Sequence, residues 1–365
     1  QSAGSASGVQ MLIEDDVKLD YSDVLIRPKR STITSRFDVE LEQTYTFYHS
    51  QKEWTGVPIV ASNMDTTGTF EMHNALRKHK MVTCIARHYN KLDNDWLSLE
   101  DEQYEHSCVM SGVSKQELTE LIHIAKTFPV SFVGLDVANG YTKNFVDAVS
   151  YVRKELPDAT IIAGNVVTRD MTAELIMAGA DIVKVGIGPG SVCTTRIKTG
   201  IGYPQLSAVI ECADAAHGMG GHIIADGGCN SSGDIVKAFA GGADFIMIGG
   251  MLAGHDECDG ELVFEDDVEE PVGMKFYGMA SNTAMERHGH PNREYRGEEG
   301  KTVIVPYRGE VKYTVLDILG GIRSACTYVG AKRLKDLTKC ATSVSYTHLR
   351  AHETRHDLVC RLLLE

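Results

Sequence analysis

The stretch DIVKVGIGPGSVCTTRIKTGIGYP, residues 181–204, decides how the rest of the chain is interpreted. It begins as a short apolar run rich in β-branched residues, which is typical of a strand buried on both faces. The run ends in glycines and a proline, which interrupt regular structure and let backbone approach a ligand closely. Hydroxyl side chains and one thiol follow directly. The stretch therefore predicts a buried strand with reactive groups beyond its carboxyl end, where parallel α/β folds gather ligands and chemistry.

The thiol in this stretch, Cys193, is a candidate nucleophile. A free thiol has a pKa of about 8.5 and attacks as the thiolate, so the N–H groups of a glycine-rich loop favour attack by stabilising the anion. Most cysteines are instead small core residues, and Cys193 differs because glycine, serine and threonine surround it. We predict that Cys193 performs nucleophilic catalysis. We expect a core role for five of the nine cysteines: Cys84, Cys108, Cys212, Cys229 and Cys326.

Short apolar runs alternate with helix-like stretches, which indicates a parallel sheet in an α/β fold. The apolar runs are residues 57–62, 82–86, 132–137, 160–163, 181–187, 222–225 and 245–248. The helical stretches are residues 70–79, 115–127, 143–155, 171–178, 205–217 and 233–240. One further run near residues 275–279 brings the total to about eight, the strand number of a TIM (β/α)8 barrel. Periodicity alone leaves a doubly wound open sheet as the alternative.

Three segments fall outside this alternation, so the predicted single barrel domain spans residues 16–342. Residues 1–15 are a predicted disordered leader, because they begin with small polar residues that have nothing to bury. Residues 254–307 are rich in acidic residues and are predicted to form a flap beside the barrel mouth. Residues 345–365 change character abruptly and resemble translated sequencing adapter, which predicts a non-native tail. The three histidines of that tail are not interpreted as a metal site.

Composition narrows the class of protein. The 365 residues carry a net charge of -14, which argues against a nucleic-acid surface because such surfaces need clustered cations. An odd number of irregularly spaced cysteines is typical of reduced thiols in the cytosol. The sequence contains no apolar stretch near the roughly 18 residues that a membrane span needs. These features predict a soluble enzyme of the cytosol, with no nucleic-acid or membrane partner.

Two glycine pairs suggest a phosphate site. Gly227 and Gly228 follow one predicted strand, and Gly249 and Gly250 follow the next. Their backbone N–H groups would face the rim of the barrel, where late loops often hold a phosphate. Either pair alone is equally well explained as a tight turn into a helix. Both pairs together with Ser191 favour a phosphate cradle.

The motif GIGPGSVCTTR, followed by TGIGYPQLSA, resembles the active-site loop of the IMP dehydrogenase/GMP reductase family. The TTR and GYPQ elements are similar to the reductase branch of that family. The resemblance extends over about residues 16–342, so it does not depend on one motif. It implies the barrel fold and the NADPH-dependent conversion of GMP to IMP and ammonia. It also implies that Cys193 attacks C2 of the purine and holds it as a covalent thioimidate.

The resemblance assigns roles to individual positions. Expelling ammonia needs a proton donor, and the matching positions are Thr195 and, through the YRGEEGKT match, Glu299. Asp226 matches the position that binds the ribose diol. The implied substrate-binding set is Ser191, Asp226, Gly227, Gly228, Gly249, Gly250, Gly278, Met279, Ala280, Arg296, Gly297, Glu298 and Gly300.

The implied cofactor is NADPH. No GxGxxG motif follows the first strand, so the dinucleotide site is not of the Rossmann type. The family positions that match its groove across the barrel mouth are Arg87, Asp136, Val137, Ala138, Ile187, Gly188, Met279, Tyr295 and Arg296. A neighbouring subunit of a homotetramer is expected to contribute Ser35, Arg36, Ser324, Ala325, Cys326 and Thr327. The resemblance also implies K⁺ bound by carbonyls of Gly188, Gly190, Cys193 and Arg196.

The chain departs from the family pattern at three positions. It has Arg87 where a lysine is expected, and Ala280 and Glu298 where serines are expected. The last two positions face the purine edge in the family. Losing a hydroxyl there weakens guanine binding by about 1 kcal/mol per lost hydrogen bond. We expect these changes to affect affinity more than reaction type.

Three alternative functions remain open from the sequence. An IMP dehydrogenase-like enzyme would oxidise IMP to XMP, but members of that branch usually carry an inserted pair of CBS modules. Only about forty residues separate Ala86 from Phe132, too few for that insertion. A non-catalytic nucleotide-binding barrel is disfavoured because Cys193, Thr195 and Glu299 are all present. A flavin-dependent barrel is the third alternative, because a late-strand phosphate site also suits FMN.

Overall fold

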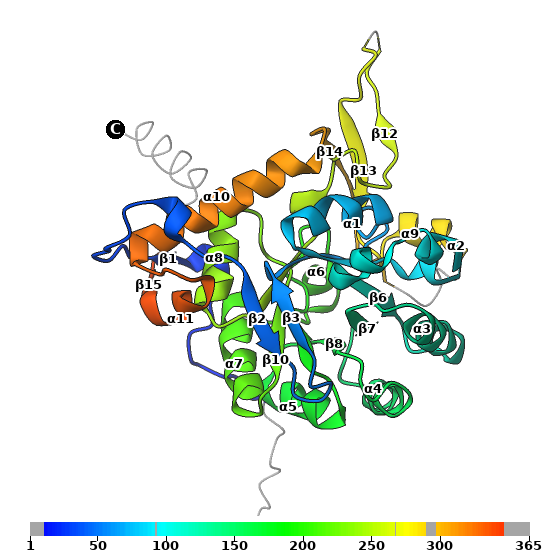
Figure 1. Ribbon diagram of the computed structural model, residues 1–365, viewed down its shortest axis with the longest axis horizontal. Coiled ribbons are helices and arrows are strands. Elements are labelled where there is room, and N and C mark those ends of the chain that lie inside the picture. Colours follow the sequence, from blue (N-terminus) through cyan, green and yellow to red (C-terminus); the bar gives the residue numbers. More distant parts are fainter. Residues whose placement is uncertain (1–10, 92, 267, 290–296, 347–365) are drawn as a thin grey trace, which may run out of the picture.

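The computed structural model describes residues 11–91, 93–266, 268–289 and 297–346. Eight parallel strands close into a barrel in the order β10-β11-β4-β5-β6-β7-β8-β9, and helices surround it (Figure 1). The closed barrel confirms the predicted TIM-barrel fold and excludes the open sheet. The barrel strands are β4 Ile59–Ala61, β5 Val82–Ile85, β6 Ser107–Ser111, β7 Phe132–Asp136, β8 Ile161–Val166, β9 Ile182–Val185, β10 His222–Asp226 and β11 Phe245–Ile248.

The helices begin where the sequence predicts them, to within two residues. Thr69 and Ser114 cap two of them by accepting hydrogen bonds from backbone N–H groups of the first turn. The helices are α1 Phe70–Leu76, α2 Asp93–Leu97, α3 Lys115–Thr127, α4 Lys143–Glu155, α5 Arg169–Ala178, α6 Thr195–Thr199, α7 Gln205–Gly218, α8 Ser232–Ala240, α9 Asn282–Arg287, α10 Val311–Val329 and α11 Leu337–Cys340. Short 3-10 turns are η1 Tyr21–Asp23, η2 Arg36–Asp38, η3 Arg77–His79, η4 Arg87–Lys91, η5 Asp101–His106, η6 Gly250–Leu252 and η7 Leu334–Asp336.

The eighth barrel strand is β6, and the prediction of a barrel strand near residues 275–279 is wrong. The β6 sequence, SCVMS, is short and bounded by serines, so it lacks the apolar signal of its neighbours. Residues 275–279 instead overlap β13, Gly273–Tyr277, which belongs to an antiparallel sheet outside the barrel. A short apolar run indicates a strand, but it does not identify the sheet to which the strand belongs.

One end of the barrel is closed by a hairpin formed by β2, Gln43–Thr46, and β3, Glu53–Gly56. Phe47 and Trp54 of this hairpin region are buried against Phe132 and Phe245 inside the barrel. The plugged end lies at the amino ends of the strands, because β7 and β11 begin at these two phenylalanines. Ligands are therefore expected at the opposite, carboxyl end.

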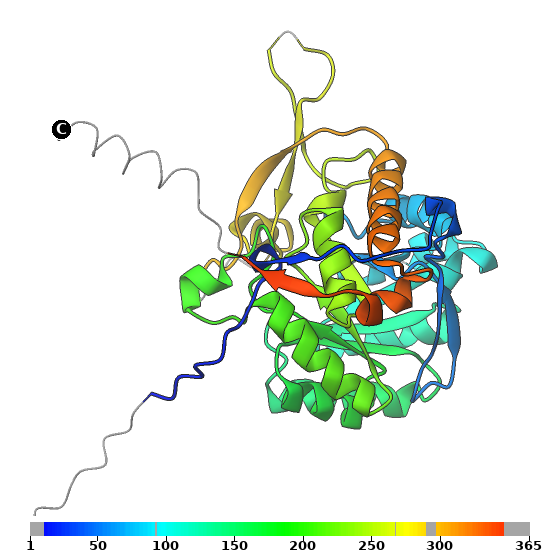
Figure 2. The ribbon, with the colours of Figure 1, turned by 90° about the vertical axis from the view of Figure 1, so that its left-hand side faces the viewer.

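The predicted flap contains a three-stranded antiparallel sheet that projects from the barrel in both ribbon views (Figures 1 and 2). Its strands are β12 Leu262–Val263, β13 and β14 Thr302–Pro306. Phe276 of this sheet is buried with Val192 and Ala253, which lie outside residues 254–307, so the sheet packs on residues next to the barrel. The core of the flap thus includes Val192, which immediately precedes Cys193.

The two ends of the described chain pair with each other. Strand β1, Val24–Ile26, is antiparallel to β15, Ser343–Ser345, and the two lie side by side in Figure 2. The backbone N–H of Tyr346 also donates to the carbonyl of Asp23. Ser345, the first residue of the predicted non-native tail, is thus the last residue of a paired strand. Residues 347–365 lie outside the described residues.

Four of the five cysteines expected in the core are fully buried: Cys84, Cys108, Cys212 and Cys326. Cys229 is only half-buried, so that prediction is wrong in part. Among the described helices, none is long and apolar enough to cross a membrane.

Candidate active site

The loop after β9 is hydrogen-bonded to the returning strand of the flap. Cys193 faces Gly300 in an antiparallel bridge. The N–H of Thr194 donates to the Glu299 carbonyl at 2.8 Å, and the N–H of Lys301 donates to the Val192 carbonyl at 2.9 Å. The cysteine loop is thereby held between the barrel and the flap, so residues far apart in sequence meet at Cys193.

A continuous hydrogen-bonded chain runs from the thiol to a carboxylate. Cys193 Sγ donates to Thr195 Oγ1 at 3.2 Å, and Thr195 Oγ1 donates to Glu299 Oε2 at 2.8 Å. All three side chains are half-buried. This geometry brings together the three predicted catalytic residues and provides a path for a proton between sulfur and carboxylate.

The site also contains a buried lysine, Lys184, which was not predicted from the sequence. Lys184 is the third residue of β9, and its side chain is only 4% exposed. Its Nζ lies 2.9 Å from Asp136 Oδ1 and 2.7 Å from Asp226 Oδ2. Burial alone would lower the pKa of Lys184, but the two carboxylates hold it well above its usual value. The ammonium therefore ties a predicted cofactor residue to a predicted substrate residue.

Two asparagines, also missed, orient the same carboxylates. Asn63 Nδ2 donates to Asp136 Oδ2 at 2.8 Å, and Asn165 Nδ2 donates to Asp226 Oδ2 at 2.9 Å. Burial raises the pKa of Asp136, yet Lys184 and Asn63 outweigh it and lower the pKa below the ordinary value. The sequence does indicate Lys184, because a charged residue in the apolar run DIVKV is unusual. It contains no comparable indication for the two asparagines.

Of the two glycine pairs, Gly250 lies beside Ser191, whereas Gly227 and Gly228 lie against Pro189, two residues before Ser191. A methyl group added to Gly250 would sit 2.9 Å from Ser191 Oγ, so these two loops touch. Gly227 and Gly228 have φ angles of 91° and 86°, which only glycine adopts without strain. A pocket of about 530 Å³ opens here; its lining includes Ser191, Asn230, Ser231, Ser232, Gly250 and Arg308.

Arg308 was not predicted from the sequence. Its guanidinium lines this pocket and donates to the Met251 carbonyl at 3.3 Å. Ser231, the N-cap of α8, and Ser232, its first residue, also line the pocket, so the N-terminus of this helix borders the same space. A guanidinium, serine hydroxyls and a helix N-terminus are groups that suit a phosphate.

The flap supplies the other predicted substrate residues. Gly278, Met279 and Ala280 follow β13, and Gly278 packs closely on the Val192 carbonyl. Gly297, Glu298 and Gly300 precede β14. Glu298 Oε1 accepts the N–H of Asn282 at 3.2 Å, so this carboxylate caps α9. Arg296 and Tyr295 lie outside the described residues.

The predicted cofactor residues fall into two separate groups. The first follows the carboxyl ends of the strands β5, β7 and β9: Arg87, Asp136, Val137, Ala138, Ile187 and Gly188. The second lies on η2 and the C-terminal half of α10: Ser35, Arg36, Ser324, Ala325, Cys326 and Thr327. Ala325 lines a different, apolar pocket with Ile26 and Tyr328.

Of the residues implied as K⁺ ligands, Gly188, Gly190 and Cys193 lie on the loop after β9, whereas Arg196 lies in α6 and its carbonyl accepts the N–H of Gly200 at 3.1 Å. Gly188 has a φ of 87°, and its Cα packs against the stem of Arg196. The Arg196 guanidinium is engaged by Asp20 and by the carbonyl of Tyr203, so only its backbone carbonyl is a potential ligand. The Gly190 carbonyl already accepts the N–H of Cys193 at 3.1 Å, with one lone pair left.

Fold and site together define a (β/α)8-barrel enzyme with a thiol, a hydroxyl and a carboxylate linked in series at the carboxyl ends of its strands. The chain belongs to the IMP dehydrogenase/GMP reductase family. The family model described as "IMP dehydrogenase / GMP reductase domain" matches residues 18–356.

Curated relatives cover almost the whole chain. It is 54% identical to GMP reductase 1 of Mus musculus over 342 residues, which is 92% of this chain and 97% of the relative. It is 57% identical to GMP reductase of Citrobacter koseri over 92% of this chain and 96% of the relative. It is 55% identical to GMP reductase of Caenorhabditis elegans, over 92% and 94% respectively.

Proposed function

We propose that this protein catalyses the NADPH-dependent reductive deamination of GMP to IMP and ammonia. The observation that carries the proposal is the hydrogen-bonded chain Cys193–Thr195–Glu299, which joins a nucleophile to a proton reservoir. The relatives named GMP reductase align with this chain over 94–97% of their own length, which supports the same activity.

This chain of hydrogen bonds can carry the proton away from the Cys193 thiol and so activate it as a nucleophile. As Cys193 attacks C2 of the purine, its thiol proton passes to Thr195 Oγ1, and the Thr195 proton passes to Glu299 Oε2. The sulfur becomes bonded to carbon, and Glu299 becomes neutral. General acid–base assistance of this kind contributes about 10²–10⁴-fold to a rate.

The same proton then serves the leaving group. The 2-amino group departs as ammonia only after protonation, and Glu299 returns the proton through Thr195. The purine remains bonded to Cys193 as a thioimidate. One proton therefore travels from sulfur to carboxylate and then to nitrogen, and the site needs no other acid.

The pocket beside Ser191 is the proposed binding site for the phosphate of GMP. Ser191 Oγ, the backbone of Gly250 and the Arg308 guanidinium converge there. Both contacts of Asp226 to Lys184 and Asn165 use Oδ2. We assign Oδ1 of Asp226 to the ribose diol, because a carboxylate oxygen fixed from behind is a good acceptor for hydroxyls.

NADPH fits the first group of predicted cofactor residues. These residues follow strand ends on the side of the barrel that carries Asp136, whose orientation is fixed by Lys184 and Asn63. NADPH, when bound, supplies the hydride that reduces C2. Arg87 is exposed and forms a single ion pair with Glu117, so its guanidinium can turn towards the 2′-phosphate.

Three further assignments accompany this proposal. Neutral carbonyl oxygens suit a hard cation, and we assign K⁺ to those of Gly188, Gly190, Cys193 and Arg196. We assign the second cofactor group, on η2 and α10, to a neighbouring subunit of a homotetramer. The activity places the protein in purine nucleotide interconversion, and we expect it to work in the cytosol.

The test is absorbance of NADPH at 340 nm with GMP, with and without K⁺, combined with an ammonia assay. We expect GMP-dependent oxidation of NADPH and release of one ammonia per NADPH, faster with K⁺. NADH formation from NAD⁺ and IMP, without the reductive reaction, would instead assign the chain to the dehydrogenase branch. Absence of both reactions would contradict the proposal.

A further inference from the structure

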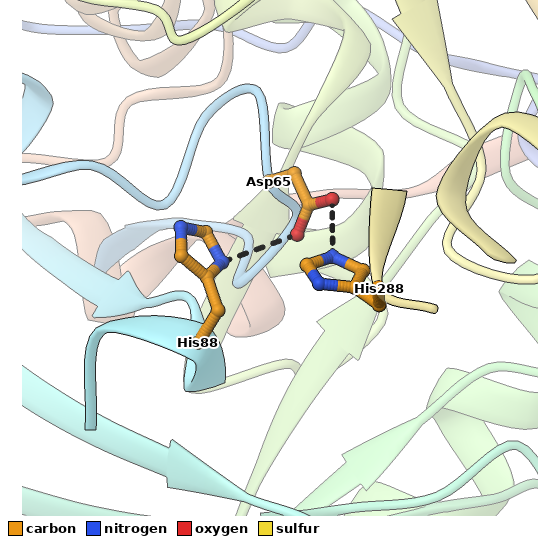
Figure 3. A group of neighbouring side chains, drawn as sticks. All are labelled: Asp65, His88 and His288. Carbon is orange, nitrogen blue, oxygen red and sulfur yellow. Dashed lines mark hydrogen bonds and ion pairs between the residues drawn. The ribbon is translucent and has the colours of Figure 1, made fainter. Parts of the chain in front are cut away.

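Two histidines and an aspartate outside the reaction centre converge between the barrel rim and the flap. Asp65 lies in the loop after β4, His88 in η4 after β5, and His288 directly after the flap helix α9. Figure 3 shows the three side chains pointing towards one another. Their potential ligand atoms all lie within 4.8 Å of one another.

Asp65 is the centre of this group and is almost fully buried, with its side chain 1% exposed. Its Oδ2 accepts from His288 Nε2 at 2.7 Å and from the Tyr277 hydroxyl at 2.9 Å. Its Oδ1 faces His88 Nδ1 at 3.4 Å, which is longer than an ordinary N–H···O hydrogen bond. Both Oδ1 and that nitrogen are buried without a hydrogen-bond partner among the described residues. Such orphaned atoms are costly unless a further group joins them.

A metal ion would satisfy both atoms. Ligand atoms bonded to Zn²⁺ at about 2.0 Å in a tetrahedron lie about 3.3 Å apart, which is close to the separation of Oδ1 and Nδ1. We propose that Asp65, His88 and His288 bind a divalent transition-metal ion of the Zn²⁺ type between the barrel rim and the flap. Two imidazoles and one carboxylate are a common protein ligand set for Zn²⁺, with a water in the fourth position.

The charges around the group are compatible with a dication. Two neutral imidazoles and one carboxylate leave one positive charge in excess. The nearby Arg287 pairs through Nη2 with Asp259 and donates through Nη1 to Tyr277, while its Nε lies 3.9 Å from Asp65 Oδ2, so part of its charge already faces the carboxylate. His288 would bind the ion through a ring nitrogen that carries no proton, because a ligating imidazole nitrogen must be deprotonated.

The site also connects to the substrate residues of the flap. The backbone N–H of Asp65 contacts Met279 Sδ at 3.4 Å, and Met279 belongs to the predicted purine-binding segment. A metal that crosslinks His288 to Asp65 and His88 would hold the flap in the described position. Metal occupancy would therefore slow flap opening and protect the flap from proteolysis, independently of whether GMP is the substrate.

A second group with the same residue types provides a matched control. His217, His222 and Asp244 lie near the plugged end of the barrel. There Asp244 Oδ2 accepts from His217 Nε2 at 2.8 Å and from the backbone N–H of Ile223 at 2.9 Å, and Oδ1 lies 3.3 Å from His222 Nδ1, which is buried without a hydrogen-bond partner among the described residues. The difference from the first group is that Asp65 Oδ1 is itself, within the described chain, a buried atom without a partner, and Asp244 Oδ1 is not. This carboxylate joins the turn before β11 to β10 and crosses no boundary between barrel and flap. We assign it a structural role.

The experiment is titration of the metal-free full chain with Co²⁺, a spectroscopic substitute for Zn²⁺, followed by visible absorption. The background variant carries His348→Gln, His352→Gln and His356→Gln, so that the tail histidines cannot contribute. We expect visible bands that saturate at one Co²⁺ per chain. His288→Gln should weaken this binding at least about tenfold, Asp65→Asn should do the same, and His217→Gln should not change it.

A second readout follows flap opening by limited proteolysis with and without Zn²⁺. We expect Zn²⁺ to slow cleavage within residues 254–307 in the background variant but not in His288→Gln. Circular dichroism of each variant verifies its fold, and His288→Gln, at a half-exposed position, leaves the burial of Asp65 intact. Absence of saturable Co²⁺ binding, binding unchanged by His288→Gln, or a strong thiolate-to-cobalt charge-transfer band would overturn the proposal.

Discussion

Thr195 Oγ1 donates a 2.8 Å hydrogen bond to Glu299 Oε2 while accepting one from Cys193 Sγ at 3.2 Å. One hydroxyl thus joins the loop after β9 to a residue 104 positions later in the chain. The reaction centre is complete only when the flap rests on the barrel, because Glu299 belongs to the flap. The backbone hydrogen bond from the Thr194 N–H to the Glu299 carbonyl holds these two segments in register.

The bridging hydroxyl can be tested by two substitutions at one position. Thr195→Val keeps the shape but breaks proton transfer, so we expect kcat to fall by about 10²–10⁴-fold, the usual contribution of acid–base catalysis. Thr195→Ser retains the hydroxyl and should retain most of the activity. Steady-state kinetics with GMP and NADPH measure both. Equal activity of the valine and serine variants would show that the hydroxyl carries no proton.

Lys184 is expected to matter for stability as well as for binding. Lys184→Met leaves Asp136 and Asp226 as uncompensated neighbouring carboxylates, which should cost about 3–5 kcal/mol of unfolding free energy at pH 7.5. The loss should shrink at pH 5, because protonation of one carboxyl removes the repulsion. Urea denaturation at both pH values measures it. Lys275→Met, at an exposed flap ion pair, is the control and should cost less than about 1 kcal/mol.

The phosphate pocket can be tested by adding a single methyl group. In Gly250→Ala the new carbon would lie 2.9 Å from Ser191 Oγ, so the Ser191 hydroxyl must turn away or one of the two loops must move. We expect the KM for GMP to rise at least about tenfold, equivalent to about 1.4 kcal/mol, with a smaller change in kcat. Gly320→Ala in α10 meets nothing within 4 Å and should leave KM unchanged. An unchanged KM in Gly250→Ala would show that this loop is not part of the phosphate site.

The histidine pair near the plugged end predicts a pH dependence of stability. The hydrogen bond to Asp244 raises the pKa of His217 against the opposing effect of burial. Its stabilising contribution is therefore fully present below the unfolded pKa of about 6.5 and is lost as the pH rises through the higher folded value. His217→Gln should destabilise the protein by less than about 1 kcal/mol at pH 6 and by almost nothing at pH 9. Thermal unfolding at the two pH values measures this, and an equal loss at both would contradict the assignment.

The alternation of apolar runs and helical stretches, together with the family resemblance, predicted the barrel, and the sequence also singled out the three side chains that the structure joins by hydrogen bonds. Glycine and hydroxyl residues after an apolar run located Cys193, and the resemblance located Thr195 and Glu299. The eighth strand was missed because SCVMS is short and polar at both ends. A strand of that kind is recognisable only through its pairing with β5 and β7, which is a long-range property.

Contacts that depend on three-dimensional convergence were not predictable. Lys184, Asn63 and Asn165 act through carboxylates on other strands, and nothing in their local sequence specifies those partners. Asp65 and His288 are 223 positions apart, so their proximity follows from the flap folding over the rim. Local patterns determine elements, whereas the site arises from the closure of the barrel and the docking of the flap.

The most direct test of the reaction centre is intact-protein mass spectrometry of samples quenched during turnover with GMP and NADPH. Wild-type protein should carry an adduct with the mass of GMP minus ammonia, located on Cys193, and Cys193→Ala should carry none while still binding GMP. Glu299→Gln should form almost no adduct from GMP, yet form it from IMP and NADP⁺, a direction that requires no expulsion of ammonia. An adduct in Cys193→Ala, or one formed from GMP as fast in Glu299→Gln as in wild type, would contradict the account.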